Sequence, residues 1–370
     1  GAGQGDMEPR DLSEHSPYVP GRGVEEVARD LGIDRSSLIK LSSNENPHGP
    51  SPAAVETIRE HASNVNVYPK SSHADLTERI AELWDVSPTQ VWVSPGADGS
   101  IDYFSRAALE PGDRVLVPDP GFAYYEMSAR YHHAGVETYT LSPADEFEQT
   151  AETVLDAYDG ERVVYLTSPH NPSGSVVPLD TVEAIADGTD EETLVVVDEA
   201  YGEFSPVDSA IGLLDGRDDI AVLRTFSKAY GLAGLRIGYG VVPEAWGAAY
   251  ARINTPFAAN ELACRAALAA IDDEEHVDKT VETAAWARDH IETALDAPTF
   301  DSAGNFVLAR VGDGEAVAAA AQEHGVIIRD CTSFGLPDCV RISTGTREET
   351  REAVSRLNEV LAALDRGVEA

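Results

Sequence analysis

The sequence predicts an α/β protein with a large domain, built on a mostly parallel sheet between helices, and a smaller α+β domain. Short, nearly continuous runs of Val, Ile and Leu recur between residues 91 and 227, and longer amphipathic stretches separate them. Strands covered by helices on both faces lose the alternation of polar and apolar residues, so this pattern is typical of a parallel sheet. Beyond Thr255 the pattern changes to long alanine-rich stretches followed by shorter apolar runs. This change predicts the second domain.

The individual elements follow from these runs. Strands of the large sheet are expected at 91–94, 114–119, 162–169, 193–201 and 220–227. Helices between them are expected at 99–109, 124–133 and 179–186. In the second part of the chain, helices are expected at 257–272 and 275–296 and strands at 305–311 and 339–344. We therefore divide the chain into an N-terminal arm that contributes to the small domain (1–44), a large domain (45–255) and a small domain (256–370).

The charge of the chain is unusual for a folded protein. Its 370 residues include 65 acidic and 27 basic side chains, which gives a formal net charge of −38, while 42% of the residues are hydrophobic. This hydrophobic fraction is that of an ordinary globular protein and excludes a disordered acidic chain. A strongly negative field repels phosphate backbones, so nucleic acid is not expected as a partner. Dispersed acidic residues suit a salt-loving host, because dissolved salt screens their mutual repulsion.

The sequence offers no signal for a membrane, a metal or a disulfide framework. No uninterrupted apolar run approaches the roughly 20 residues that a membrane span needs. The first residues have neither a basic start nor an apolar segment, so a cytoplasmic protein is expected. Cys264, Cys331 and Cys339 form no CxxC pair, and we expect them to be reduced thiols without a metal.

Lys228 is the first candidate for chemistry. The chain has only four lysines, and this one follows an apolar run in the segment TFSKAYGLAGLRIGYG (225–240). The hydroxyls of Thr225 and Ser227 and the guanidinium of Arg236 suit phosphate oxygens, and the glycines let the backbone approach a ligand closely. A lysine beside a phosphate site suggests that it holds an aldehyde cofactor as a Schiff base. The alternative is an ordinary lysine exposed to solvent in a turn.

A cofactor with a pyridine ring needs three more groups, and the ends of other predicted strands supply them. Asp198 ends the apolar run VVVD, where a carboxylate needs a cation such as a protonated ring nitrogen. Asn171 follows another strand in SPHNPSG and can donate to the ring oxygen. Tyr125, in PGFAYYE, provides an aromatic ring for stacking. The alternatives are a helix N-cap for Asp198 and a simple Asn-Pro turn for Asn171.

Four motifs resemble those of the fold-type I pyridoxal-phosphate-dependent aminotransferases. They are NENPHGPSP (44–52), SPHNPSG (168–174), DEAY (198–201) and SKAYGLAGLRIGY (227–239). Each motif alone is weak, but their joint order and spacing are specific. The resemblance extends from PYVPG at 17–21 to CVRISTGTREE at 339–349, and within the family it is strongest to the enzymes that act on histidinol phosphate. It implies the fold-type I architecture and pyridoxal 5′-phosphate as cofactor.

The resemblance also implies roles for the matching residues. Lys228 is implied to form the Schiff base, and Asp198 to hold the protonated ring nitrogen. Asn171 and Tyr201 are implied to hydrogen-bond the ring oxygen, and Tyr125 to stack on the ring. Binding of the cofactor's phosphate is implied for Thr225, Ser227, Arg236 and the backbone amides of Ala97 and Asp98, which open the helix expected at 99–109.

Other matching residues concern the subunit partner and the substrate. Tyr68, in VYPKSS, resembles a tyrosine that reaches the phosphate site of a neighbouring subunit, which implies a homodimer. The positions that line the substrate pocket in that family correspond to Tyr18, Asn46, Asn305, Arg329 and Arg341. Three residues at the rim of the phosphate site depart from the family pattern: Gly99, Gly121 and Lys70.

The implied function is transamination between L-histidinol phosphate and 2-oxoglutarate, a step of histidine biosynthesis, with Lys228 as the general base. A threonine-phosphate decarboxylase and an aromatic amino acid aminotransferase share this scaffold and stay open as alternatives. A non-catalytic, cofactor-binding regulator is the alternative from another class, and the net charge of −38 argues against it. The expected partners are small-molecule substrates and a second copy of the chain, without nucleic acid or membrane.

Overall fold

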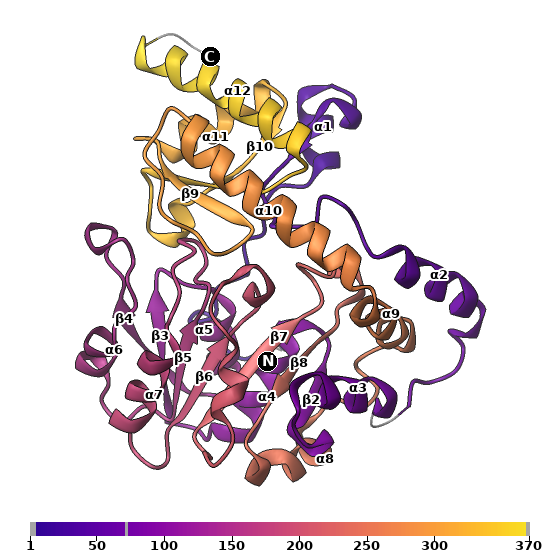
Figure 1. Cartoon of the computed structure of the whole chain (residues 1–370). Coiled ribbons are helices and arrows are strands. Elements are labelled where there is room, and N and C mark those ends of the chain that lie inside the picture. The colour runs from indigo at the N-terminus through magenta and orange to yellow at the C-terminus, as the bar shows by residue number, and fades with distance from the viewer. Residues whose placement is uncertain (1–4, 71–72, 368–370) are drawn as a thin grey trace.

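The computed structural model describes residues 5–70 and 73–367. The chain forms a large lower part, which contains the main sheet, and a smaller upper part that is made from the N-terminal and C-terminal segments (Figure 1). The predicted class is confirmed: a mostly parallel sheet lies between helices, and a second, smaller α+β unit is joined to it.

The large sheet has seven strands in the order β2-β8-β7-β6-β5-β3-β4. Strands β3 to β7 are mutually parallel, whereas β8 is antiparallel to both of its neighbours. The strands are β2 (Val91–Ser94), β3 (Arg114–Asp119), β4 (Gly135–Thr140), β5 (Val163–Thr167), β6 (Leu194–Asp198), β7 (Ile220–Thr225) and β8 (Gly238–Val241).

Helices cover both faces of this sheet, as the apolar runs predict. Alternate residues of β6 belong to different cores: Val195 and Val197 face one side, and Leu194 and Val196 face the other. Helices α2, α3, α7 and α9 pack on the first side, and α4 and α5 pack on the second. The helices of the large domain are α2 (Pro52–His61), α3 (Ala74–Trp84), α4 (Gly96–Ala108), α5 (Tyr124–Tyr131), α6 (Ala151–Ala157), α7 (Leu179–Gly188), α8 (Tyr250–Ile253) and α9 (Glu261–Asp272).

Strand β8 was not expected, because its glycines suggested only a loop near a ligand. The reason for the glycines is close packing by α4. A Cβ atom on Gly240 would lie 2.8 Å from a ring carbon of Phe104, and one on Gly238 would lie 3.0 Å from the amide nitrogen of Ala97. Glycine therefore lets the start of α4 lie directly on this strand.

The small domain combines a three-stranded antiparallel sheet, of order β11-β12-β9, with a short parallel pair, β1 and β10. Its strands are β1 (Ile39–Lys40), β9 (Phe306–Arg310), β10 (Val326–Ile327), β11 (Arg329–Asp330) and β12 (Cys339–Ser343). Val340 and Ile342 of β12 enter the core of this domain, so Arg341 and Ser343 lie on the opposite face of the strand. The helices here are α1 (Val24–Leu31), α10 (Glu274–Ala294), α11 (Gly314–Glu323) and α12 (Arg347–Asp365).

Helix α9 lies beyond the predicted boundary at 255/256, and it packs on α2 and α3 of the large domain. Its Ala263 and Ala267 are buried in the same hydrophobic cluster as residues of those two helices. Helix α10 makes the crossing instead, since it runs from α9 to the small domain over 21 residues, or about 30 Å (Figure 1). The sequence does not show which helix crosses between the domains, because both stretches are alanine-rich.

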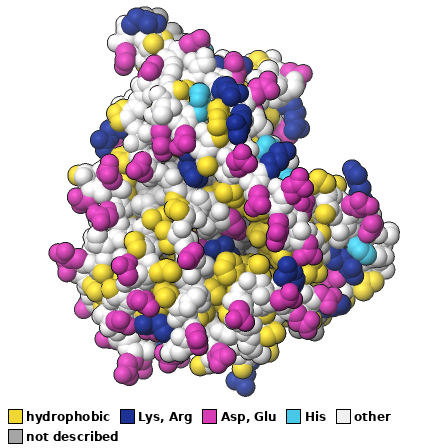
Figure 2. Space-filling model, viewed as in Figure 1, with side chains coloured by type: hydrophobic (Ala, Val, Ile, Leu, Met, Phe, Trp, Pro, Cys, Tyr) yellow, Lys and Arg dark blue, Asp and Glu magenta, His cyan; other side chains and the backbone are white. Residues whose placement is uncertain are grey.

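Acidic side chains are distributed over the visible face of both domains (Figure 2). Among the helices of residues 5–70 and 73–367, none combines the length and hydropathy needed to cross a membrane. The same residues contain no group of three His, Cys, Asp or Glu side chains that could hold a metal ion. Cys264, Cys331 and Cys339 are buried free thiols.

Candidate active site

Three neighbouring strands of the large sheet end at one edge, and a polar residue lies at or just beyond each end. In β5 and β6 the last residues, Thr167 and Asp198, are directly paired. Strand β7 ends at Thr225, three residues before Lys228. Because the carboxyl ends of parallel strands share an edge, topology alone brings these groups together.

Lys228 is half-buried at this edge. Its Nζ atom donates to the carbonyl oxygen of Ser43 at 3.3 Å and lies 5.6 Å from the centre of the Tyr201 ring. Neither contact is an ion pair, although the chain carries 65 acidic residues. Among the described residues, no carboxylate forms a salt bridge with this amine, which lies beside the predicted ring donor.

Asp198 is a buried carboxylate without a cation. Its Oδ2 accepts a hydrogen bond from the hydroxyl of Tyr125, and its Oδ1 accepts one from the amide of Ala200 at 3.0 Å. Among the described residues, no Lys, Arg or His side chain forms a salt bridge with it. Burial raises the pKa of Asp198 from 3.8 to about 6, against the smaller lowering effect of these two hydrogen bonds. A cation held against Oδ1 or Oδ2 would offset the cost of burying this charge.

Tyr125 does not fit the predicted stacking role. Its side chain is completely buried, and one face of the ring stacks on Tyr165 with 4.4 Å between ring centres. Because its hydroxyl proton goes to Asp198, the hydroxyl of Thr167 must be the donor in their 2.8 Å contact. Tyr125 supports the carboxylate from behind. Phe122, three residues earlier, is half-buried, and its ring meets that of Tyr125 at nearly a right angle, with 5.6 Å between ring centres.

The two predicted donors to a ring oxygen, Asn171 and Tyr201, are both held by other polar groups. Arg341 donates to Oδ1 of Asn171 at 2.7 Å, which leaves the amide hydrogens of Asn171 for a ligand. Asn44 donates to the hydroxyl oxygen of Tyr201 at 3.0 Å. The adjacent His170 has both ring nitrogens occupied, by Ser173 and by the carbonyl of Pro120, and burial lowers its pKa to about 4. It therefore shapes the loop before Asn171 as a neutral residue.

The predicted phosphate groups form a cradle around the start of α4. Arg236 lies 3.4 Å from the hydroxyl of Ser227 and 3.6 Å from the carboxylate of Asp98. A Cβ atom on Gly96 would lie 2.5 Å from a guanidinium nitrogen of Arg236, so the arginine lies directly against the first turn of the helix. No side chain caps this helix, and its first N–H groups, including those of Ala97 and Asp98, keep their capacity to bind an anion.

Thr225 completes this cradle, and two departures from the family pattern have local causes. The Thr225 hydroxyl accepts from the amide of Ser227 at 3.1 Å. A Cβ atom on Gly99 would lie 2.6 Å from Pro95, and one on Gly121 would lie 2.4 Å from the carbonyl oxygen of Pro118. The ring of Pro95 therefore leaves no room for a side chain at residue 99, and the backbone of Pro118 leaves none at residue 121. The third departure, Lys70, pairs with Asp75 on the surface.

Two arginines approach the site from the small domain. Arg329 and Arg341 are directly opposite each other in β11 and β12. Arg341 is buried and donates to Asn171 and to the carbonyl of Ser42, and its Nε atom has no partner. Arg329 donates to the carbonyl of Val19 at 3.1 Å, and its Nε atom is also buried without a partner. Among the described residues, neither guanidinium forms a salt bridge with a carboxylate.

The other predicted substrate residues differ in what they offer. Tyr18 is half exposed and meets the edge of Phe122 at 6.2 Å. The amide group of Asn46 binds Ala229, Thr280 and His48, so its polar atoms tie loops together. Asn305 donates to the carbonyl of Asn44, and its Oδ1 atom is buried without a partner.

Tyr68 does not belong to this cluster within one chain. It is 79% exposed and packs on Phe257, which is itself 42% exposed, at 4.9 Å between ring centres. Val65 and Val67 beside it are 67% and 64% exposed. This forms an apolar surface patch.

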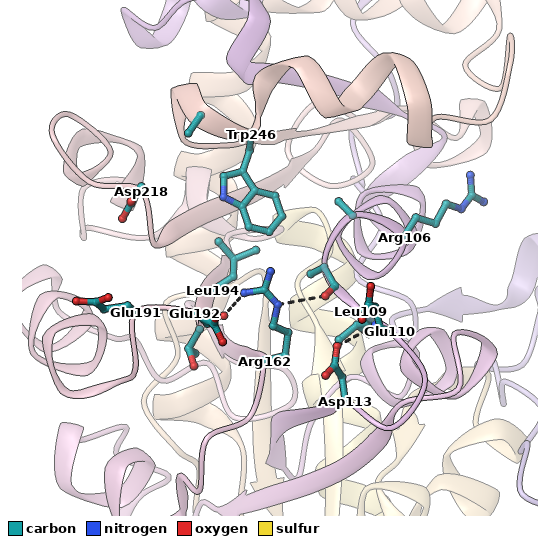
Figure 3. A pocket seen from close by; sticks show the side chains of 14 residues that line it. Arg106, Leu109, Glu110, Asp113, Arg162, Glu191, Glu192, Leu194, Asp218 and Trp246 are labelled. Atoms are coloured by element: carbon teal, nitrogen blue, oxygen red, sulfur yellow. Dashed lines mark hydrogen bonds between the residues drawn. The ribbon is translucent and has the colours of Figure 1, made fainter.

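A hollow of about 640 Å³ lies at the opposite edge of the large sheet, where the strands begin (Figure 3). Figure 3 shows Arg162 below the ring of Trp246, and the guanidinium donates to the carbonyls of Ala108 and Glu192. None of the predicted site residues lines this hollow. The other arginine that lines it, Arg106, donates to the carbonyl of Ile253 and the hydroxyl of Thr255, so both arginines are occupied and the hollow adds nothing to the chemistry of the site.

Comparison with known proteins supports the resemblance seen in the motifs. Residues 36–357 match the family described as Aminotransferase class I and II. The histidinol-phosphate aminotransferase of Halorubrum lacusprofundi is 79% identical over 98% of this chain and 100% of its own length. That of Haloferax volcanii is 65% identical over 96% and 99%. These relatives come from halophilic archaea, the kind of host that the charge predicts.

A solved structure extends the similarity to the whole fold. The crystal structure of histidinol-phosphate aminotransferase from Sinorhizobium meliloti, in complex with pyridoxal-5′-phosphate, superposes with a TM-score of 0.87. The two sequences are 29% identical, and the match covers 98% of this chain and 99% of the other.

Proposed function

Because this chain belongs to the class I and II aminotransferase family, we propose that it transfers the amino group of L-histidinol phosphate to 2-oxoglutarate, with pyridoxal 5′-phosphate as cofactor. The relatives at 64–79% identity are named histidinol-phosphate aminotransferase, and they match nearly the full length of this chain. The reaction would yield imidazole-acetol phosphate and glutamate.

The residues present fit the cofactor. Asp198 is a buried carboxylate that needs a cation, and the uncapped start of α4 beside Arg236 needs an anion. A pyridinium ring and a phosphate group supply these two charges. When bound, pyridoxal phosphate supplies an aldehyde that links to amines and a protonated ring that accepts electron density from the substrate's α-carbon.

The chain's own residues then have distinct tasks. Lys228 would anchor the cofactor through its amine and would serve as the base, with Nζ moving the proton at the substrate's α-carbon. Asp198 keeps the ring nitrogen protonated, since its carboxylate stabilises a positive charge beside it. Asn171 and Tyr201 would donate to the ring oxygen. Arg236, Ser227 and Thr225 hold the phosphate end.

One observation carries the choice of substrate: Arg329 and Arg341 lie side by side without a carboxylate partner. In a chain with 65 acidic residues, two neighbouring unneutralised guanidiniums indicate a site for an external anion. An aminotransferase must bind a phosphorylated amine and a dicarboxylate in turn. The guanidinium fork matches phosphate and carboxylate oxygens alike, so the same arginines serve both substrates.

The test uses the purified chain loaded with pyridoxal phosphate in high salt. We expect glutamate to form from histidinol phosphate and 2-oxoglutarate, and histidinol without the phosphate to react with a much lower kcat/KM. Similar kcat/KM values for the two amines would show that no phosphate is recognised and would reject this substrate. Release of carbon dioxide from threonine phosphate would instead identify a decarboxylase.

We also propose a homodimer in which Tyr68 reaches the phosphate site of the neighbouring subunit. The exposed apolar patch of Val65, Val67, Tyr68 and Phe257 supports this, because surfaces of this kind are typical of subunit contacts. A mixture of Lys228→Ala and Tyr68→Ala chains tests it. If Tyr68 acts across the interface, mixed dimers contain one intact site, and activity returns on mixing; if it acts within its own chain, activity does not return. The cytoplasm as compartment stays a prediction.

A further inference from the structure

Asn44 joins the small domain to a residue of the predicted cofactor site. It is 1% exposed and has a φ angle of 54°, in the left-handed region that asparagine tolerates better than most residues. Its backbone amide and its side-chain Oδ1 both contact the hydroxyl of Ser343, at 2.9 and 2.7 Å. Its Nδ2 contacts the hydroxyl of Tyr201 at 3.0 Å. Both side chains that meet this amide are themselves buried.

The hydrogen bonds of this chain of groups lead from Ser343 to Tyr201. The backbone N–H of Asn44 donates to the hydroxyl oxygen of Ser343, and the Ser343 hydroxyl donates to Oδ1 of Asn44. Nδ2 is then the atom of this amide that faces Tyr201. Because Nδ2 donates to the tyrosine oxygen, Tyr201 keeps its own proton for another acceptor.

We propose that Asn44 is a positioning residue that directs the hydroxyl proton of Tyr201 toward the ring oxygen of the cofactor. The inference rests on the proposed function, since it requires a ring oxygen beside Tyr201. Without Asn44 the hydroxyl would rotate freely and could present a lone pair to the ring oxygen. With Asn44 donating, the hydroxyl oxygen is occupied, and the proton points away from Asn44.

The same arrangement connects the donor to the substrate side of the site. Ser343 is two residues from Arg341 on β12, and side chains at this spacing share one face of a strand. Arg341 binds the oxygen of Asn171, and Ser343 binds the oxygen of Asn44. One face of this small-domain strand therefore orients both predicted donors to the ring oxygen.

The test measures the pH at which the visible absorbance of the bound pyridoxal phosphate changes. A donor to the ring oxygen stabilises its deprotonated form, so losing the donor raises this pH. We expect Tyr201→Phe to raise it by about 1–2 pH units. Asn44→Gly, which accepts a positive φ and donates nothing, should raise it by about 0.5–1 unit. In the double variant the shift should equal that of Tyr201→Phe alone, because Asn44 acts through Tyr201.

Two outcomes overturn the role of Asn44: an unchanged titration in Asn44→Gly, or a shift that adds fully to that of Tyr201→Phe. If Asn44→Gly does not retain the cofactor, Ser343→Ala decides, since it frees the amide of Asn44 to rotate while keeping Asn44 and Tyr201. An upward shift in Ser343→Ala supports the proposal, and no shift overturns it. If the unmodified chain with added cofactor shows no titrating absorbance, the proposed function itself fails.

Discussion

The cofactor side and the substrate side of this site are built in different ways. On the cofactor side, Asp198 ends the middle one of three adjacent parallel strands, and Asn171 and Lys228 lie in the loops that follow the two strands beside it, so all three belong to one edge of one sheet. On the substrate side, Arg329 and Arg341 come from a separate sheet in the small domain, and Tyr18 comes from the N-terminal arm. In the proposed function, one rigid edge of a sheet would carry the reaction, while contacts between distant segments would select the molecule that reacts.

Lys228→Ala tests the cofactor side most severely. Because the amine supplies both the anchor and the base, we expect the variant to fold and to turn over no substrate in the glutamate assay. Lys279→Ala, an exposed lysine of α10, is the matched control and should keep full activity. Near-normal turnover in Lys228→Ala would remove the centre of the proposed mechanism.

Asp198→Asn should bind the cofactor and lose about 10²–10⁴-fold in kcat, the range of a group that stabilises charge or moves a proton. The neutral amide no longer holds the ring nitrogen in its protonated form. The measurement is single-turnover kinetics with saturating cofactor. A rate equal to that of the unmodified chain would leave Asp198 only the structural task of accepting hydrogen bonds from Tyr125 and Ala200.

Although it lowers activity, Asp198→Asn should raise the stability of the cofactor-free chain. Burial raises the pKa of Asp198 from 3.8 to about 6, so the folded chain binds this proton more tightly than the unfolded chain does. Protonated Asp198 therefore favours the folded chain below about pH 4, and this contribution to the free energy of unfolding is lost as the pH rises through about 6. At pH 7, Asp198→Asn should therefore unfold at a higher temperature, with a gain of about 1–3 kcal/mol in free energy of unfolding. The gain should shrink at pH 4, and a lower melting temperature at pH 7 would contradict the pKa shift.

The sequence predicts the cofactor side better than the substrate side, for a physical reason. A polar residue after a buried strand must lie at the sheet edge, so Asp198 and Lys228 are found from local pattern alone. Tyr125 shows the limit, because only the direction in which α5 leaves the sheet decides whether its ring or its hydroxyl faces Asp198. Sequence reasoning selects Asn46 and not Asn44 as a site residue, because Ser343, the partner of Asn44, lies 299 positions away in the chain.

Two substitutions on the substrate side should have smaller effects on catalysis. Arg341→Ala should lower kcat/KM for both histidinol phosphate and glutamate by about 30-fold to several thousand-fold, the loss of a desolvated charge pair. Arg329→Ala should penalise the phosphorylated amine more than glutamate. Arg310→Ala is the matched control, since Arg310 lies on the neighbouring strand and pairs with Asp338 on the surface. Equal losses for both substrates in Arg329→Ala would contradict its assignment to the phosphate.

Lowering the salt concentration should destabilise the whole chain, and it should affect the substrate side and the cofactor side of the site to different extents. Reducing the salt from 1 M to 0.1 M lengthens the screening distance from about 3 Å to about 10 Å and exposes the repulsion among the charges that sum to −38. We expect the melting temperature to fall, by about 1–2 °C for each kcal/mol lost in a chain of 370 residues. An unchanged melting temperature would contradict the inferred halophilic character.

Within the salt range where the chain stays folded, the two sides should respond differently. Arg329 is half-buried, and dissolved ions reach its guanidinium, so KM for histidinol phosphate should depend on salt. Asp198 is 4% exposed, and buried charges are screened far less, so the pH titration of the bound cofactor should stay nearly constant. KM and the pH titration are measured on the same folded sample across one salt series, so unfolding cannot account for a difference between their salt dependences. If the titration moved with salt as strongly as KM does, the cofactor side would be as open to solvent as the substrate side, and the distinction between the two would fail.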